Sequence, residues 1–565
     1  MSAWRSRLLR EGPALALLAG ISVVALVLRY QHLDYGLPYV YNQDEGSHFT
    51  SRAVAMFGGD PDPGYFQNPS AFTYLVHVAL RFKYGGWWPF GDFDDVIQHF
   101  ARDPSGIYVA ARRVAALLGV AGAVAVYSVG RRLWDRRTGL VAAAVLAFAF
   151  LPVTYSRIAL TDVGVLVPVA LVLLFAVRIQ ETGSLRWCAA AGAAAGVAIG
   201  FKYTAGLVLL APLAALALRR EWRGAALGGL VVLAVALVAF FITTPFFFID
   251  LSDARRQLGA QTNRANGQPK FGQTGSSGFT YYLGSLTWGL GWLALLATVA
   301  GGVIVASRDR ARAVVLLIFP LALFVYLSLQ ARFFGRWLLP AYPAFALLAG
   351  VAVTTAAAWL RERAPRLELP AVALGALLLV WQSLAADARS MAVLGNPDTR
   401  AVAREWLMAH TKPEVRAIIE PAVPARYYRQ RQIKHSRQAF VSQFVQAVRR
   451  TRIEYGATLS PRVIDQYREQ GYCTVVTMSL IEGRSVKAKD PDALAYYARL
   501  KRESKHVFSV SPYRFDKKPQ PFDFDLSYNY YSDAYRLPGP KVDVYRLNNC
   551  KQRYGGGGNP PAVEA

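Results

Sequence analysis

Two neighbouring carboxylates, Asp44 and Glu45, stand in the segment "YVYNQDEGSHFTSRA" at residues 39–53, with His48 and Arg52 close behind them. The segment follows directly on the first long apolar run of the chain. A carboxylate at such a boundary can bind a cation, orient a hydroxyl or take a proton. Solvated loop charges are the plainer interpretation, but an acidic pair beside a histidine and an arginine favours a functional one.

Further charged residues occur where other apolar runs end. Asp162 closes the short segment "YSRIALTD", Lys202 lies in "FKYT", and Arg332 and Arg336 lie in "LQARFFGRWLLPAYP". A lysine or arginine at a helix end can simply extend its charged group to the membrane interface. Alternatively, these cations can bind a lipid phosphate, which arginine can hold through two parallel hydrogen bonds.

The composition is that of a membrane protein. Of the 565 residues 54% are hydrophobic and only 18% are charged, and the apolar residues are gathered in runs. The net charge of +26 is spread as short basic clusters between these runs, a pattern typical of cytoplasmic loops and of attraction to anionic lipid or phosphate. Membrane lipids are therefore expected partners and nucleic acid is not. Three cysteines are too few for a disulfide scaffold and lack metal-site spacing.

The apolar runs and basic clusters together predict about eleven transmembrane helices. The first is interpreted as uncleaved, because its apolar run is longer than a signal-peptide core and lacks a small-residue cleavage site. The fifth and sixth, "CAAAGAAAGVAIG" and "AGLVLLAPLAALAL", are short and suit close packing. The other spans are expected at about residues 107–130, 138–153, 163–178, 224–246, 279–305, 313–330, 337–359 and 369–386. This arrangement places the N-terminus in the cytoplasm and the C-terminal part outside.

The expected fold class is an all-α polytopic membrane domain followed by a small α/β extracytoplasmic domain. The first covers residues 1–386, with a first external loop at residues 31–105, and the second covers residues 387–550. In the second domain, helix-like stretches such as "QAFVSQFVQAVRR" alternate with strand-like ones such as "CTVVTMS" and "VDVYRL". Residues 551–565 are expected to be a disordered tail.

Carboxylates and a phosphate site at the outer face indicate a reaction between a lipid-phosphate donor and an external acceptor. The attacking alcohol of such a reaction needs a base, and the departing phosphate needs cations. The sequence has no Walker loop and no dinucleotide glycine fingerprint, which fits a donor that is not a nucleotide.

The sequence resembles the bacterial C-type (GT-C) integral-membrane glycosyltransferases, in the branch related to protein O-mannosyltransferases and lipid A aminoarabinose transferases. The segments that carry the resemblance are "NQDEGSHF", "YSRIALTD", "GVAIGFKYTAGLVLLAPL" and "RFFGRWLLPAYPAFALLAG", in this order. The resemblance implies a GT-C fold, a polyprenyl-phosphate sugar donor and the bacterial cytoplasmic (inner) membrane. It also implies an extracytoplasmic glycan, lipid or protein acceptor and inversion at the anomeric carbon.

By the same resemblance, Asp44 takes the proton of the acceptor hydroxyl and Glu45 supports it. The residues that would complete the substrate and acceptor site are Asp162, His48 and Arg52. The cations that would hold the departing lipid phosphate are Arg332, Arg336 and Lys202.

Two alternatives stay open. No cofactor is certain, but a divalent metal ion could be held by Asp44, Glu45, His48 and Asp162. A transporter or flippase of a lipid-linked substrate is the second choice of function. Transporters usually carry functional charges in mid-membrane, whereas the polar residues of interest here lie at one surface.

Cys473 and Cys550 both lie in the expected external domain, where oxidation is permitted. Each belongs to or follows a strand-like segment, so the two sulfurs could meet if these strands are neighbours; otherwise both are unpaired. Cys188 is expected deep in a helix and out of reach. The same domain carries four tyrosines that form either aromatic core or a surface for stacking sugar rings: Tyr528, Tyr530, Tyr531 and Tyr535.

Overall fold

The structure, a computed structural model, describes residues 2–84, 94–267, 269–273, 277–412, 415–420, 423, 427 and 459–554. The chain divides into two compact units, each assembled from several segments. The first unit comprises Met1–Asp34, Asp44–Asn266 and Ser277–Ala388. The second comprises Tyr35–Gln43, Gly267–Ser276 and Arg389–Ala565.

Eight helical segments in the described part of the chain are long and apolar enough to cross a membrane. They are Gly12–Tyr30, Ser105–Leu133, Thr161–Thr182, Trp222–Thr243, Gly278–Arg308, Arg310–Ser328, Gly335–Arg363 and Pro365–His410. The remaining expected spans correspond to shorter helices: α7 (Arg136–Phe148) with α8 (Phe150–Tyr155), α10 (Leu185–Phe201), and η3 (Tyr203–Leu209) with α11 (Leu210–Leu218). The protein is therefore a multi-pass membrane protein, and the expected polytopic helical fold is confirmed.

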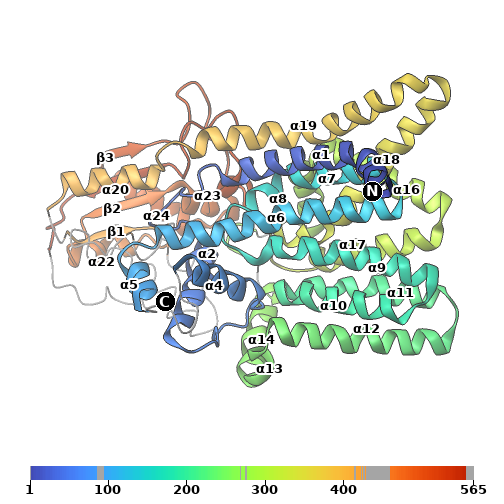
Figure 1. The fold of residues 1–565 in the computed structure, drawn as a ribbon. Helices are drawn as coiled ribbons and strands as arrows, with labels where there is room; N and C mark the ends of the chain where they lie inside the picture. The colour runs from blue at the N-terminus through green and yellow to red at the C-terminus, as the bar shows by residue number, and fades with distance from the viewer. Residues whose placement is uncertain are drawn as a thin grey trace. The chain divides into compact units, whose positions relative to one another are not determined.

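The long helices of the first unit lie side by side in one bundle (Figure 1). They are α1 (Ser2–Tyr30), α6 (Ser105–Leu133), α9 (Leu166–Thr182), α12 (Trp222–Thr243), α16 (Trp292–Arg308), α17 (Arg310–Ser328) and α18 (Tyr342–Arg363). Helix α19 (Glu368–Leu394) begins in the first unit and ends in the second. The segments that lead into them are η2 (Thr161–Val165), α15 (Gly278–Leu286), η4 (Thr287–Gly291), η5 (Gly335–Ala341) and η6 (Pro365–Leu367).

Small residues let the short helix α10 pack directly on the backbone of α12. A Cβ added at Gly192 would lie 2.5 Å from the carbonyl oxygen of Val232, and one added at Gly196 would lie 2.2 Å from that of Ala236. Both distances are too short for any side chain, so glycine is required at these two contacts. The Gly/Ala-rich sequence of this span is thus used for close approach between helices.

Two helix starts that follow basic clusters are capped by aspartate. Asp135 accepts a hydrogen bond of 2.8 Å from the backbone N–H of Thr138 at the start of α7. Asp309 accepts one of 2.9 Å from the N–H of Arg312 at the start of α17. Each cap satisfies a backbone donor that the first helical turn leaves open, and so fixes where the helix begins.

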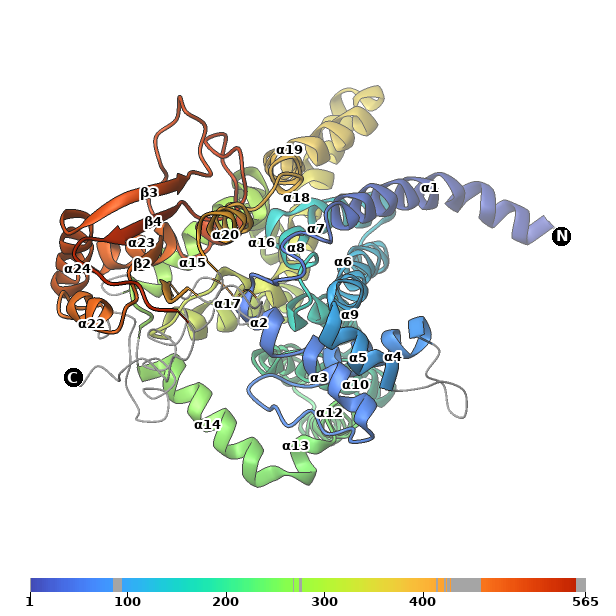
Figure 2. The same cartoon turned by 90° about the vertical axis from the view of Figure 1, so that its left-hand side faces the viewer.

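Short helices of the first expected external loop gather at one end of the bundle (Figures 1 and 2). They are α2 (Gln43–Ser47), α3 (Thr50–Ala55), η1 (Met56–Gly58), α4 (Ala71–Tyr84) and α5 (Asp94–Arg102). Buried aromatic rings hold them: Phe49 and Phe72 meet edge to face with their centroids 5.7 Å apart. Two further helices, α13 (Phe246–Ile249) and α14 (Leu251–Gly267), follow α12.

The second unit is built around a four-stranded sheet, so the expected small α/β fold is also confirmed. Its strands are β1 (Ala417–Ile419), β2 (Thr474–Met478), β3 (Ser504–Val510) and β4 (Val542–Leu547), in the order β1-β2-β4-β3. β1 and β2 are parallel, whereas β4 is antiparallel to both β2 and β3. The helices are α20 (Thr399–His410), α22 (Val463–Glu469), α23 (Ser479–Ala488), α24 (Pro491–Arg502) and α25 (Leu526–Asn529).

A segment from the first expected loop, Tyr35–Gln43, belongs to this second unit. Tyr35 donates a hydrogen bond of 2.7 Å to Asp398, and the guanidinium carbon of Arg400 lies 3.6 Å from the ring centroid of Tyr41. These contacts join residues more than three hundred positions apart in the sequence, and sequence patterns did not indicate them.

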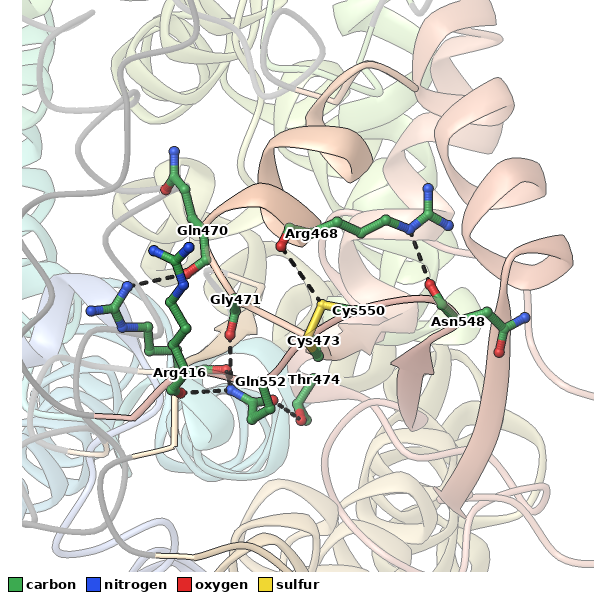
Figure 3. Close-up of a disulfide and its surroundings, with 10 residues drawn as sticks. Arg416, Arg468, Gln470, Gly471, Cys473, Thr474, Asn548, Cys550 and Gln552 are labelled. Atoms are coloured by element: carbon green, nitrogen blue, oxygen red, sulfur yellow. Dashed lines mark hydrogen bonds between the residues drawn. A yellow bond between two sulfur atoms is a disulfide. The ribbon is translucent and has the colours of Figure 1, made fainter.

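The structure joins Cys473 and Cys550 in a disulfide, with their Cα atoms 5.5 Å apart (Figure 3). Cys473 directly precedes β2 and Cys550 follows β4, and these two strands pair in the sheet. Beside the disulfide, Gln552 donates hydrogen bonds of 2.9 Å to the carbonyls of Arg416 and Gly471. The disulfide and these bonds together hold the end of the chain to the sheet.

Two expectations for the second unit fall on residues that the structure does not describe. The helix expected at "QAFVSQFVQAVRR", residues 438–450, lies outside the described residues. Most of the expected tail, residues 555–565, also lies outside them.

Candidate active site

Asp44, Arg336, Asp162 and Lys202 form a continuous chain of ion pairs in the first unit. Arg336 Nη2 pairs with Asp44 Oδ2, and Arg336 Nε lies 3.8 Å from Asp162 Oδ2. Lys202 Nζ pairs with Asp162 Oδ1 and donates to the carbonyl of Arg336 at 3.3 Å. The side chain of Asp44 is 38% exposed, compared with 8% for Asp162. Asp44 is therefore the carboxylate of this chain that is most open to an incoming molecule.

Each of these four residues lies where a helix begins or ends. Asp44 is in the first turn of α2, and Lys202 is the extended residue that ends α10. Asp162 lies in η2, which continues into α9, and Arg336 lies in η5, which continues into α18. Because η2 contacts η5, the N-terminal ends of α9 and α18 lie close together. Helix N-termini carry partial positive charge and favour a bound anion, so they add to the cations of this site.

Glu45 points away from this chain of ion pairs and into the protein. Its carboxylate accepts hydrogen bonds from Arg112 Nε at 2.7 Å and Arg112 Nη2 at 2.8 Å. It also accepts one of 2.9 Å from the backbone N–H of Ala159, and the residue is only 1% exposed. A third nitrogen of Arg112 donates to the carbonyl of Leu33 at 2.6 Å. The pair thus ties α2 to α6 and to the segment just before Asp162.

Arg112 is a site residue that sequence reasoning missed. It is buried within the apolar run of α6, and it is held by the acid next to Asp44. An arginine inside an apolar span is itself a signal, because a charge there requires a partner. The motif "ARRV" in the second span carried that signal.

His48 and Arg52 are organised around a buried tyrosine. His48 Nε2 lies 3.6 Å from Asp44 Oδ1, and its ring stacks on Tyr65 with the centroids 4.8 Å apart. The guanidinium carbon of Arg52 lies 4.6 Å from the same ring centroid, and Arg52 donates to the carbonyl of Pro63. Burial raises the pKa of Tyr65 to about 12, so its phenol stays protonated. His48 thus borders the carboxylate, whereas Arg52 fixes the loop behind it.

Arg332, the third cation expected to bind phosphate, lies in the loop between α17 and η5. It is half-buried, and its backbone N–H donates to the carbonyl of Ala265 at 3.2 Å. This bond connects the loop that carries Arg336 to the end of α14.

The arrangement does not fit a metal ion. Within the described residues, no three histidine, cysteine, aspartate or glutamate side chains come together in a way that could hold one. Arg336 and Lys202 instead pair with the carboxylates of Asp44 and Asp162. We therefore derive no catalytic step from a metal.

Residues 107–248 match the family model described as dolichyl-phosphate-mannose-protein mannosyltransferase. The matched segment contains Arg112, Asp162 and Lys202, whereas Asp44 and Arg336 lie outside it. No curated protein sequence matches the chain.

The structure is similar to solved structures of two membrane proteins. ArnT from Cupriavidus metallidurans in the apo state has 18% identity and a TM-score of 0.52, covering 82% of this chain and 93% of that one. The same protein bound to undecaprenyl phosphate has 17% identity and a TM-score of 0.53, covering 94% and 98%. The archaeal oligosaccharyltransferase AglB from Archaeoglobus fulgidus, in complex with an inhibitory peptide and a dolichol-phosphate, has 13% identity, a TM-score of 0.51 and coverage of 89% and 74%. These structures show a shared fold, and the family-model match at residues 107–248 supports the resemblance to protein O-mannosyltransferases.

Proposed function

We propose that the protein is a glycosyltransferase that moves a sugar from a polyprenyl-phosphate donor to an extracytoplasmic acceptor. The observation that carries the proposal is Arg336, which lies between an open carboxylate, Asp44, and a buried one, Asp162. A base and a phosphate-binding cation are thereby held in one site, as this reaction requires. The similarity to ArnT bound to undecaprenyl phosphate supports the class of donor.

The proposed reaction is a single displacement at the anomeric carbon. Asp44 takes the proton of the acceptor hydroxyl while the hydroxyl oxygen attacks that carbon. The bond from the anomeric carbon to the phosphate oxygen breaks, and its electron pair leaves with the polyprenyl phosphate. The sugar is then attached to the acceptor with inverted configuration.

The ion pairs of the site couple donor binding to release of the base. Arg336 already pairs with Asp44, so a phosphate that takes this guanidinium competes directly with the carboxylate. Lys202 keeps its pairing with Asp162 and can still direct a further N–H toward the phosphate. Donor binding thus leaves Asp44 free to accept a proton only when a leaving group is in place.

Glu45 acts in this scheme as a positioning residue. Its two oxygens already accept three hydrogen bonds from Arg112 and Ala159, and it is buried. A carboxylate held in this way cannot approach an acceptor hydroxyl. It fixes instead the start of α2, and with it the position of Asp44.

The change Asp44→Asn tests the proposal. The purified variant should keep its fold and lose transfer by at least about a hundredfold, since a positioned base typically contributes that much. Asp34→Asn, the same change at an exposed position shortly before the site, is the matched control and should retain activity. Turnover of a polyprenyl-phosphate sugar by Asp44→Asn at the rate of the parent would refute the role of the base.

Lipid-linked sugars from a deletion strain provide the second test. A transferase consumes its donor, so its loss should leave an unspent polyprenyl-phosphate sugar that mass spectrometry identifies, together with an envelope glycan, lipid or protein that lacks that sugar. Loss of a flippase would instead change which side of the membrane holds the lipid-linked sugar. In that case the purified protein would transfer no sugar. The accumulated lipid would also reveal whether the sugar is a hexose or a pentose.

A further inference from the structure

The second unit contains a cavity of about 620 Å³ between helix α23 and the loop at residues 519–522. Pockets for small ligands occupy roughly 300–1,000 Å³, so this one is large enough for one. The residues that matter for its chemistry are Ser479, Glu482, Tyr513, Gln520, Phe522 and Tyr535. They come from α23 and from three separate parts of the long segment between β3 and β4.

Aromatic side chains supply flat apolar surface to this cavity. The rings of Tyr513 and Tyr535 lie with their centroids 4.9 Å apart, and Phe522 also lines the cavity. Tyr535 is buried, as is its neighbour Tyr531, and both belong to one small hydrophobic cluster. Tyr535 contributes to the core and lines the cavity.

The hydroxyl groups in the cavity retain capacity for further hydrogen bonds. Tyr513 Oη lies 3.4 Å from both the Tyr535 hydroxyl and the carbonyl of Gln520. These distances are long for an O–H···O bond, whose usual length is about 2.7–2.8 Å. A polar ligand can therefore gain short hydrogen bonds here without breaking strong existing ones.

Charged groups of both signs border the same space. Glu482 pairs with Lys501 at 2.6 Å through one oxygen, and its side chain is 29% exposed. Lys487 also lines the cavity, and its Nζ lies 3.8 Å from Asp523, which is a weak pairing. The cavity thus offers an acceptor and a donor, with no excess of one sign that would select an ion.

The wall opposite α23 is fixed in place. Pro519 and Pro521 restrict the backbone of the loop. Gly483 of α23 lies so close to the loop that an added Cβ would meet the Cβ of Phe522 at 2.5 Å. A binding surface that is rigid before the ligand arrives loses little entropy on binding.

We propose that this cavity binds a saccharide unit of the acceptor. Flat aromatic surface covers the C–H face of a sugar ring, and the hydroxyls, carboxylate and ammonium bind its hydroxyl groups. The volume accommodates roughly one or two sugar rings. Its role in choosing the acceptor rests on the proposed transferase function, whereas saccharide binding itself does not.

Saturation-transfer NMR on the full-length protein in detergent, without donor, tests the binding. The probes are the methyl glycosides of glucose, galactose, mannose and N-acetylglucosamine, with maltose and cellobiose. Phe522→Ala should weaken binding about three- to tenfold, because it removes an aromatic wall. Tyr513→Phe should weaken saccharide binding by a similar factor, because the variant lacks the hydroxyl that would hydrogen-bond to the sugar. Phe515→Ala, at a fully exposed ring of the same segment that does not line the cavity, is the matched control and should bind as the parent does.

Three outcomes decide the matter. Binding that Phe522→Ala and Tyr513→Phe weaken, with a raised acceptor KM and an unchanged kcat in transfer assays, supports the proposal. Absence of binding by every probe, or equal binding by all variants with unchanged thermal unfolding, overturns it. The third outcome is saccharide binding that depends on these two residues in a protein that transfers no sugar from any donor. This result supports saccharide binding in the cavity and overturns the transferase function.

Discussion

The ion pair between Glu45 and Arg112 provides the sharpest test of how the site is built. We expect Glu45→Gln to act on stability first and on transfer only through the position of Asp44. The carboxylate accepts three hydrogen bonds, two from Arg112 and one from the backbone of Ala159. In the variant, the amide group can accept only through its oxygen, and its NH₂ group faces a donor that it cannot satisfy.

The expected loss follows from burial. Glu45 is 1% exposed and Arg112 is 4% exposed, so the guanidinium left behind has no access to water. Removing one partner of a buried ion pair costs about 3–5 kcal/mol, because the remaining charge is uncompensated. The double variant Glu45→Leu/Arg112→Met removes both charges and should recover much of that loss.

The assay is the free energy of unfolding of purified protein in mixed micelles, measured for the parent, Glu45→Gln, the single variants Glu45→Leu and Arg112→Met, and the double variant Glu45→Leu/Arg112→Met. A double-mutant cycle then isolates the pairwise energy. The matched control is Asp44→Asn, which should leave stability nearly unchanged and abolish transfer. If Glu45→Gln is as stable as the parent and yet inactive, Glu45 takes part in the chemistry and our assignment is wrong.

Further predictions concern the second unit and the topology. Cys473→Ser should lower the unfolding free energy of the second unit by about 4 kcal/mol, because the disulfide closes a loop of 77 residues and so restricts the unfolded chain. Transfer activity should be retained, and unchanged thermal unfolding would contradict the prediction. Burial raises the pKa of Glu420 from its ordinary value of 4.5 to about 8. Between these two pKa values, the folded state holds a proton that the unfolded chain releases. The free energy of unfolding should therefore fall as the pH rises from 4.5 to about 8, by up to about 5 kcal/mol in total. In Glu420→Gln, the unfolding free energy should depend less on pH than in the parent. The same pH dependence in both proteins would show that Glu420 is not its cause. Single cysteines at residues 219–223 should resist an impermeant maleimide in intact cells while those in α24 react, as the basic clusters predict; the reverse labelling would refute the span count.

The sequence indicated the helices and the four residues of the ion-pair chain, but it could not indicate how those residues pair. Hydropathy identifies a span because each span satisfies its own backbone hydrogen bonds. Pairing depends on contacts between distant segments: Lys202 pairs with Asp162 across forty positions, and Arg336 reaches Asp44 across almost three hundred. The interpretation of both cations as phosphate ligands thus missed the carboxylates that already hold them.

Proximity in sequence does not show which groups Glu45 and Arg52 contact. Both stand close to Asp44 along the chain, yet each faces a different part of the molecule. Residues i and i+1 of a helix point in different directions, so Glu45 turns into the protein where Asp44 is open. Arg52 belongs to the next helix, α3, and packs on Tyr65. Side-chain direction within short helices was the missing information.

The charges of the site explain why it can stay buried and still perform the proposed reaction. Three carboxylates, Asp44, Glu45 and Asp162, are matched there by three cations, Arg112, Lys202 and Arg336. A phosphodiester donor brings one further negative charge, which would compete with Asp44 for the guanidinium of Arg336.

In the proposed reaction, the departing phosphate gains a negative charge while Asp44 loses one by taking the proton of the acceptor. The total charge of the site is therefore the same before and after the step. A site of low dielectric constant penalises a change in net charge far more than water does. A base and a phosphate that share one arginine allow charge to move between them without such a change.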